Sequence, residues 1–96
     1  MVDGEHYAPH HFQEINMALF NAKYIVFEND GLEDMIIFSA LQQHADIAAA
    51  LDLNPVSAGN IDNGQHCFGD SYSLGISSRP EEDRAIARRV FNIDQD

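Results

Sequence analysis

A chain of 96 residues has the length of one small domain, which buries about 60–65% of its unfolded surface, and it leaves no room for a separate cofactor domain. Hydrophobic residues make up 45% of the chain, which argues against intrinsic disorder even though the formal net charge is −11. The one cysteine, Cys67, excludes an intramolecular disulfide and a zinc site built on paired thiolates.

The first predicted helix spans residues 9–22. Pro9 stands where helices often begin, and Phe12, Ile15, Leu19 and Ala22 follow at the spacing of one helical face. Residues 1–8 are expected to be a flexible N-terminus. The next two apolar runs, KYIVFE (23–28) and MIIFS (35–39), flank the turn sequence NDG (29–31) and predict a hairpin. The continuous apolarity of residues 35–38 predicts that the second of these strands is a central one.

Ser39 and Gln42 form a capping-box pattern, and the Ala-rich helix that follows is expected to continue until Asn54-Pro55. Two further strands, over 56–61 and 65–77, flank the turn DNG (62–64). A last helix is predicted to begin after Ser78, which forms a second capping-box pattern with Glu81 in the first turn. The order αββαββα predicts a single α+β domain over 1–96, with a four-stranded, mainly antiparallel sheet and the helices on one face.

The sequence CFGDSYSLG (67–75) raises the question whether Ser71 is a nucleophile, because Gly-Asp-Ser resembles the first signature block of the GDSL esterases and lipases. That resemblance implies a histidine base far downstream, but no histidine follows His66. Strand alternation is the better interpretation. It puts the large residues from Phe68 to Ile76 on the core face, and small residues, including Ser71 and Ser73, on an exposed or partner-binding face.

Charge is unevenly distributed along the chain. Residues 1–78 contain Lys23 as their single Lys or Arg and eleven acidic residues, whereas residues 79–96 contain four arginines and five acidic residues. The acidic body disfavours direct binding of nucleic acid. The residues that we expect to contact a partner are the acidic patch Glu28, Asp30, Glu33 and Asp34, the serines Ser71 and Ser73, and the helical pair Arg84 and Arg88.

Other residue types that carry chemistry do not assemble into a site. His6, His10 and His11 lie close together in sequence, but Pro9 breaks the helical spacing that two of them would need to bind one metal ion. We therefore expect no metal, no cofactor and no catalytic residue. The N-terminal sequence has neither the basic region nor the apolar run of a signal peptide, and no segment approaches about 18 continuous apolar residues. With a single cysteine, this predicts a cytoplasmic protein that does not bind membranes.

The segments HADIAAALDLNPVSAGNI and FGDSYSLGISSRPEED resemble small uncharacterised proteins of bacteriophages and prophages, over about residues 24–91. The resemblance implies a location in the cytosol of a bacterial host, and it implies no chemistry. We therefore expect a small acidic protein that acts without catalysis, by binding a protein, as an inhibitor or modulator of a host complex that handles nucleic acid or serves in defence. The alternatives are a structural phage component or homodimer, and a small serine hydrolase that uses Ser71.

Overall fold

The computed structural model of the protein describes residues 22–91. The flexible N-terminus and first helix expected from the sequence lie outside them, except for Ala22, which begins a strand. The elements are β1 (Ala22–Asn29), β2 (Leu32–Ser39), α2 (His44–Leu51), β3 (Pro55–Asp62), β4 (His66–Phe68), β5 (Asp70–Ser71), β6 (Ile76–Ser77) and α3 (Pro80–Phe91). Strands β1 to β4 form an antiparallel sheet in the order β2-β1-β3-β4, and β5 pairs with β6 separately. The predicted α+β class and four-stranded antiparallel sheet are thus confirmed.

The predicted first hairpin is present, with both strands longer than expected. Asn29 pairs with Leu32 at its end, and Asp30 and Gly31 form a two-residue turn with φ values of 56° and 83°. Positive φ at both turn residues matches the right-handed twist of paired strands, which explains why the sequence NDG lies here. The prediction that 35–39 is a central strand is wrong, because β2 is an outer strand and β1 is central.

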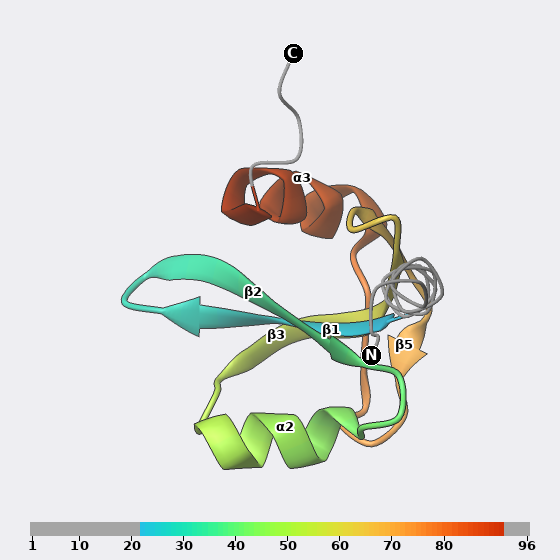
Figure 1. Cartoon of the computed structure of the whole chain (residues 1–96). Coiled ribbons are helices and arrows are strands. Elements are labelled where there is room, and N and C mark those ends of the chain that lie inside the picture. The colour runs from blue at the N-terminus through green and yellow to red at the C-terminus, as the bar shows by residue number, and fades with distance from the viewer. Residues whose placement is uncertain (1–21, 92–96) are drawn as a thin grey trace, which may run out of the picture.

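The two helices lie on opposite faces of the sheet (Figure 1), so the prediction of helices on one face is wrong. Alternate residues of β1 explain the arrangement. Tyr24 and Val26 belong to the apolar cluster that contains Ile86 of α3, whereas Ile25 belongs to the cluster that contains Ala48 of α2. A central strand that is apolar at successive positions has two faces to bury, and one helix cannot cover both.

The predicted long strand over 65–77 is also wrong. It stops at Phe68 because Gly69, with a φ of 78°, redirects the chain, and a turn follows in which the Gly75 amide donates to the Ser71 carbonyl at 2.8 Å. Period-two alternation is therefore lost. Ser71 is only 2% exposed and Tyr72 is 99% exposed. The expectation of a large-residue core face and an exposed small-residue face is thus reversed at these two positions.

Both described helices begin later than their predicted capping boxes. Ser39 Oγ accepts a hydrogen bond from the Leu41 amide within a turn, and α2 starts only at His44. At α3 the side chain that binds the free backbone N–H of Arg79 is Asp83, at 2.8 Å, instead of the predicted Ser78 and Glu81 pair. Short polar side chains can bind nearby backbone groups in turns as well as at helix starts, so the sequence pattern alone does not fix the start.

Gly59 lies where β3 passes very close to its neighbours. A Cβ atom at this position would be 2.5 Å from the backbone oxygen of Phe68 and 3.1 Å from the Cβ of Ser78. A backbone atom held in a sheet cannot move aside as the end of a side chain can. Only glycine therefore fits here without a shift of β4.

Gly59→Ala should lower the free energy of unfolding by about 1–3 kcal/mol, because the added methyl overpacks a site that is already full. Ala50→Ser is the matched control, since it also adds one heavy atom but on an exposed position of α2, and it should change stability by at most about 0.5 kcal/mol. Urea denaturation of both variants makes the comparison. Equal small losses would show that β4 can move away.

His44 is a buried polar residue at the start of α2, where it is 4% exposed. Its Nε2–H donates to the Gly59 carbonyl at 2.9 Å, and its ring meets that of Phe38 edge-on. Burial lowers the pKa of His44 below the usual 6.5, and the bond to Gly59 opposes this only in part. Folding therefore favours the neutral form of His44.

Stability should fall when the pH is lowered through about 6.5, because the unfolded chain then takes up a proton that folded His44 does not yet bind. Above that pH the contribution of His44 is fully present. His44→Gln should flatten the fall between about pH 7 and pH 5 relative to the parent protein. Parallel urea titrations of the parent and the variant across this range test the prediction, and identical pH profiles of the two proteins would contradict it.

Candidate functional site

The hairpin of β1 and β2 carries the predicted acidic patch and extends beyond both helices at one end of the molecule (Figure 1). Glu28 and Asp30 are exposed, and Asp30 lies in the turn itself. The Glu28 carboxylate accepts one long hydrogen bond, from the Asn54 amide at 3.4 Å. These two carboxylates are therefore presented to solvent at the tip of a paired hairpin.

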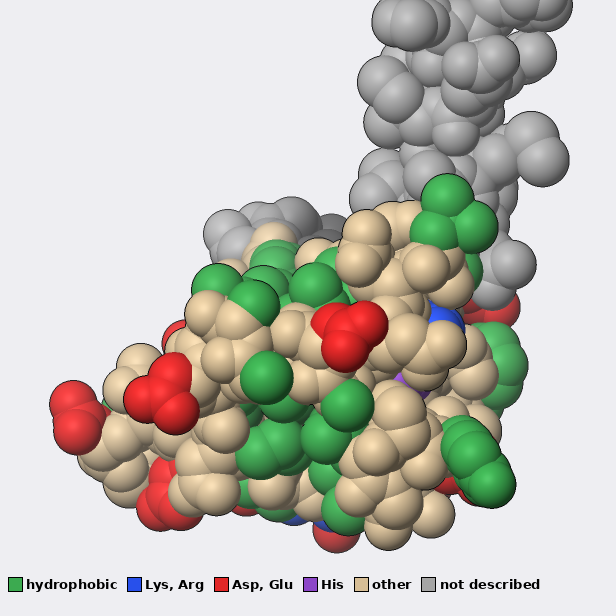
Figure 2. All heavy atoms as spheres, turned by 90° about the horizontal axis from the view of Figure 1, so that it is seen from below, with side chains coloured by type: hydrophobic (Ala, Val, Ile, Leu, Met, Phe, Trp, Pro, Cys, Tyr) green, Lys and Arg blue, Asp and Glu red, His purple; other side chains and the backbone are tan. Residues whose placement is uncertain are grey.

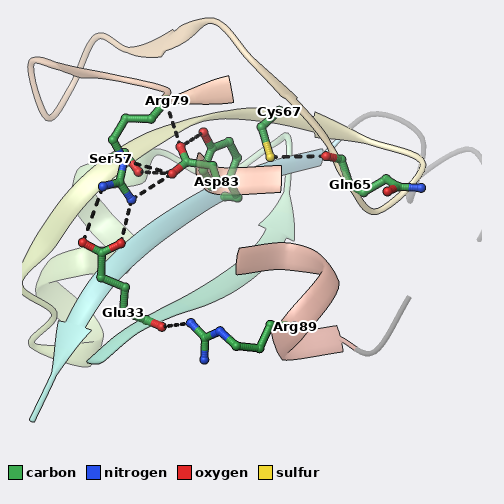
Figure 3. A network of polar contacts seen from close by, with 8 residues as sticks. Glu33, Ser57, Gln65, Cys67, Arg79, Asp83 and Arg89 are labelled. Carbon is green, nitrogen blue, oxygen red and sulfur yellow. Dashed lines mark hydrogen bonds and ion pairs between the residues drawn. The ribbon is translucent and has the colours of Figure 1, made fainter. Parts of the chain in front are cut away.

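Glu33 differs from them, because Arg79 binds it. The guanidinium donates from Nη2 to Glu33 Oε1 at 2.9 Å and from Nη1 to Oε2 at 3.4 Å, a two-point contact (Figure 3). This contact, more than any other, raises the pKa of Arg79 above its usual value. Glu33 was predicted to face a partner, but its charge is largely compensated within the molecule.

Asp34, the fourth member of the patch, and Arg89 both bind backbone groups of β2. The Asp34 carboxylate accepts a hydrogen bond from the Met35 amide at 2.9 Å, and Arg89 Nη2 donates to the Glu33 carbonyl at 2.6 Å. Free backbone groups of an outer strand are a template for pairing with another chain. Charged side chains therefore occupy part of the open edge of β2.

The Arg79 guanidinium also binds Asp83, which is fully buried and accepts hydrogen bonds from four groups (Figure 3). Tyr24 Oη donates to Oδ2, and Ser57 Oγ donates to Oδ1 at 2.8 Å. The Arg79 backbone N–H donates to Oδ2 at 2.8 Å, and its Nε donates to Oδ1 at 3.0 Å. Burial, followed by the contact with Asp83, raises the pKa of Tyr24 above its usual value, so the phenol keeps its proton.

Sequence reasoning missed this network. Its members come from β1, β3 and the start of α3, and no short motif connects them. Asp83 is one of three acidic residues, with Glu81 and Glu82, in the first turn of a helix. Acidic side chains are common there and usually exposed, so the sequence does not mark Asp83 as buried. Only the pairing of β1 with β3 brings Tyr24 and Ser57 next to it.

The two serines have separate surroundings. Ser71 Oγ is buried and accepts a hydrogen bond from the Leu74 amide at 3.1 Å, whereas Ser73 is exposed and its Oγ accepts from the Ala45 amide at the start of α2, also at 3.1 Å. Both hydroxyls thus bind the backbone of turns and of α2. A serine nucleophile requires a hydrogen bond to a histidine base. Within residues 22–91 no hydrogen bond connects Ser71 with a histidine.

Arg84 and Arg88 lie on α3 and not beside the hairpin tip. With Glu81 and Ala85 they line an open hollow of about 450 Å³ on the helix surface. Arg84 is exposed, and its Nε donates to Gln65 Oε1 at 3.5 Å, while Arg88 is half-buried. The two arginines therefore share one face of α3, whereas Glu28 and Asp30 lie on the hairpin of β1 and β2 and Ser73 binds the start of α2.

Metal or thiol chemistry has no site among the described residues. In the range 22–91 no three His, Cys, Asp or Glu side chains are placed to hold one metal ion, and His6, His10 and His11 lie outside that range. Cys67 is buried, which raises the pKa of its thiol to about 12.

Neither α2 nor α3 has the length and apolar character needed to span a bilayer.

Comparison of the chain with models of protein families, with curated proteins and with solved structures found no match.

Replacing Asp83 should be severely destabilising. Asp83→Ala leaves the Tyr24 and Ser57 hydroxyls and the buried part of Arg79 without their acceptor, for a loss of about 3–5 kcal/mol. Tyr24→Phe and Ser57→Ala each remove one donor and should cost about 1–3 kcal/mol.

Glu82→Ala is the control for Asp83→Ala, because it removes the neighbouring but exposed carboxylate, and it should cost at most about 1 kcal/mol. Chemical denaturation of all four variants gives the free energies of unfolding. If Asp83→Ala fails to fold, the two single-donor variants still test the network. Losses below about 0.5 kcal/mol in both of them would contradict it.

Proposed function

We propose that this protein acts without catalysis, as a binding protein whose acidic hairpin docks on a basic surface of a protein partner. The observation that carries the proposal is the exposure of Glu28 and Asp30 on a hairpin that extends beyond the helices. A charged surface at a protruding tip attracts an oppositely charged partner and orients it before contact.

The proposed partner is a bacterial protein that binds nucleic acid, because the cation-rich sites of such proteins are complementary to closely spaced carboxylates. An acidic tip in that site would exclude the nucleic acid and so inhibit or modulate the host complex. The resemblance to phage and prophage proteins supports a bacterial partner, since proteins that redirect host machinery act in the bacterial cytosol.

The alternatives have less support from the structure. The hydrolase hypothesis needs an accessible Ser71 with a histidine base, but Ser71 Oγ is buried and binds the Leu74 amide. The structural phage component or homodimer was inferred from a continuous face of small residues over 67–77, and the chain turns away at Gly69 instead of forming that face. A binding function therefore has the better basis.

Removing the two exposed charges at the hairpin tip should weaken binding of the partner. Glu28→Gln with Asp30→Asn keeps the polar shape, and Asn tolerates the positive φ of residue 30. The immobilised variant should retain its partner from bacterial lysate at least about tenfold less well than the parent, and about 0.5 M salt should release the partner from the parent, because the Debye length is then only about 4 Å.

Asp46→Asn with Glu82→Gln is the control, because it removes the same charge from exposed positions of α2 and α3. It should retain the partner as the parent does. Equal losses in both double variants would mean that overall charge, and not the hairpin, attracts the partner. Retention that is indifferent to salt would overturn the proposal.

A further inference from the structure

The face of the sheet that bears α2 is incompletely covered. Among the described residues, its apolar cluster contains three buried side chains, Ile25, Ala48 and Ala58, whereas seven hydrophobic side chains are half-buried: Phe27, Ile36, Phe38, Ile47, Leu53, Leu74 and Ile76. The reason is the helix itself. α2 has eight residues, of which four are alanine, and such short side chains cannot reach across to the outer strand.

Part of this half-buried apolar surface lies along β2 and the neighbouring strand β1. Leu32, Ile36 and Phe38 project from the same side of β2 because they are even numbers of residues apart, and Phe27 lies on the same face of the neighbouring strand β1. Leu32 is 67% exposed, and Leu51 at the end of α2 is 51% exposed. We call these five residues, Phe27, Leu32, Ile36, Phe38 and Leu51, the apolar strip.

The charges around the apolar strip indicate what would cover it. Figure 2 shows hydrophobic side chains in the middle of this side of the molecule, a group of acidic side chains toward one end, and further acidic side chains in the middle and at the other margins. Asp34 projects between Leu32 and Ile36, and the exposed Glu28 and Asp30 lie at the hairpin end. Residues 22–54 contain six acidic side chains against a single Lys or Arg, Lys23, whose Nζ binds the Gln42 carbonyl. An occupant with apolar side chains and a cationic end fits this arrangement.

We propose that the apolar strip docks an amphipathic segment of a protein partner, with apolar side chains over Leu32, Ile36 and Phe38 and Lys or Arg side chains toward the hairpin acids. This inference rests on the proposed function and adds the second half of the interface. Charge pairs at the tip orient the partner, and burial of the strip supplies the apolar area that rim charges do not.

Two other modes of contact fit the structure less well. An added strand would need the free backbone edge of β2, and Arg89 and Asp34 already bind the Glu33 carbonyl and the Met35 amide there. A second copy of the chain would bring the same acidic end and a further net charge of −11, so like charges would oppose its approach. The segment therefore packs side-on across the strip.

Two synthetic helical peptides test the proposal on the full chain. One has leucines at positions i, i+3, i+4 and i+7 with lysines elsewhere, and the other has the same leucines with glutamates in place of the lysines. We expect the lysine peptide to bind at least about tenfold more tightly in a fluorescence titration, and to shift the methyl NMR signals of Leu32, Ile36 and Leu51.

Leu32→Ser with Leu51→Ser should weaken binding of the lysine peptide at least about tenfold. Leu41→Ser with Tyr72→Ser is the matched control, because these side chains are 93% and 99% exposed but lie outside the apolar strip, and it should bind as the parent does. Circular dichroism of both double variants checks that they fold.

Each other outcome overturns the docking site. If the lysine peptide binds but the strip variant binds it equally well, the hairpin charges alone make the contact, and the proposed function survives without the strip. If both peptides bind equally, charge plays no part and the proposed function fails as well. Nuclear Overhauser contacts from residues 1–21 to Ile36 or Phe38, or a dimer in light scattering that is lost in the strip variant, would assign the strip to the chain itself.

Discussion

The buried carboxylate of Asp83 is the group on which the arrangement of this fold depends. A charge that is removed from water is tolerated only when several donors surround it, and here they come from β1, from β3 and from the start of α3. Arg79 extends the network to β2 through Glu33. The α3 helix is thus fixed on the sheet by polar contacts at its first turn as well as by the apolar contacts of Ile86 and Ala87.

The same network separates two classes of acidic residue that composition cannot distinguish. Asp83 and Glu33 serve the fold, since their charge is met by Arg79. Glu28 and Asp30 have no comparable compensation and lie at the hairpin tip. Two exposed carboxylates therefore lie together at the hairpin end of the sheet, close to its half-buried apolar side chains, whereas the exposed carboxylates of Asp46 and Glu82 lie on the helices.

Sequence patterns predicted the elements that local chemistry determines. The turns NDG and DNG formed hairpins, because residues that accept positive φ stand between two segments that form strands. The faces of the sheet were not predictable in this way, because the apolar run of β2 looks like a central strand while its neighbour β1 takes that place. Gly69 shows a second limit, since one residue with positive φ ends the alternation on which the assignment of Ser71 and Tyr72 to faces relied.

The candidate site was predictable only in part, for a related reason. Exposure of Glu28 and Asp30 follows from their position beside a turn, which is a local property. Glu33, by contrast, forms an ion pair with Arg79, a residue 46 positions away in the sequence. Asp83 and Tyr24, which form a hydrogen bond, are 59 positions apart. Such contacts follow from the packing of α3 on the sheet and have no signature in the spacing of residues.

The contact between Arg89 and the Glu33 carbonyl has a consequence for how the molecule would fail. Arg89 lies two residues before the end of α3 as described, in the turn where a helix opens most easily. When that last turn frays, β2 loses one of the side chains that occupy its edge while the rest of the sheet stays paired. A local opening far smaller than unfolding then uncovers the Glu33 carbonyl on the edge of a strand rich in Ile, Met and Phe, while the Asp34 carboxylate still binds the Met35 amide. Fraying of one helical turn should therefore make this edge more open to pairing with another chain.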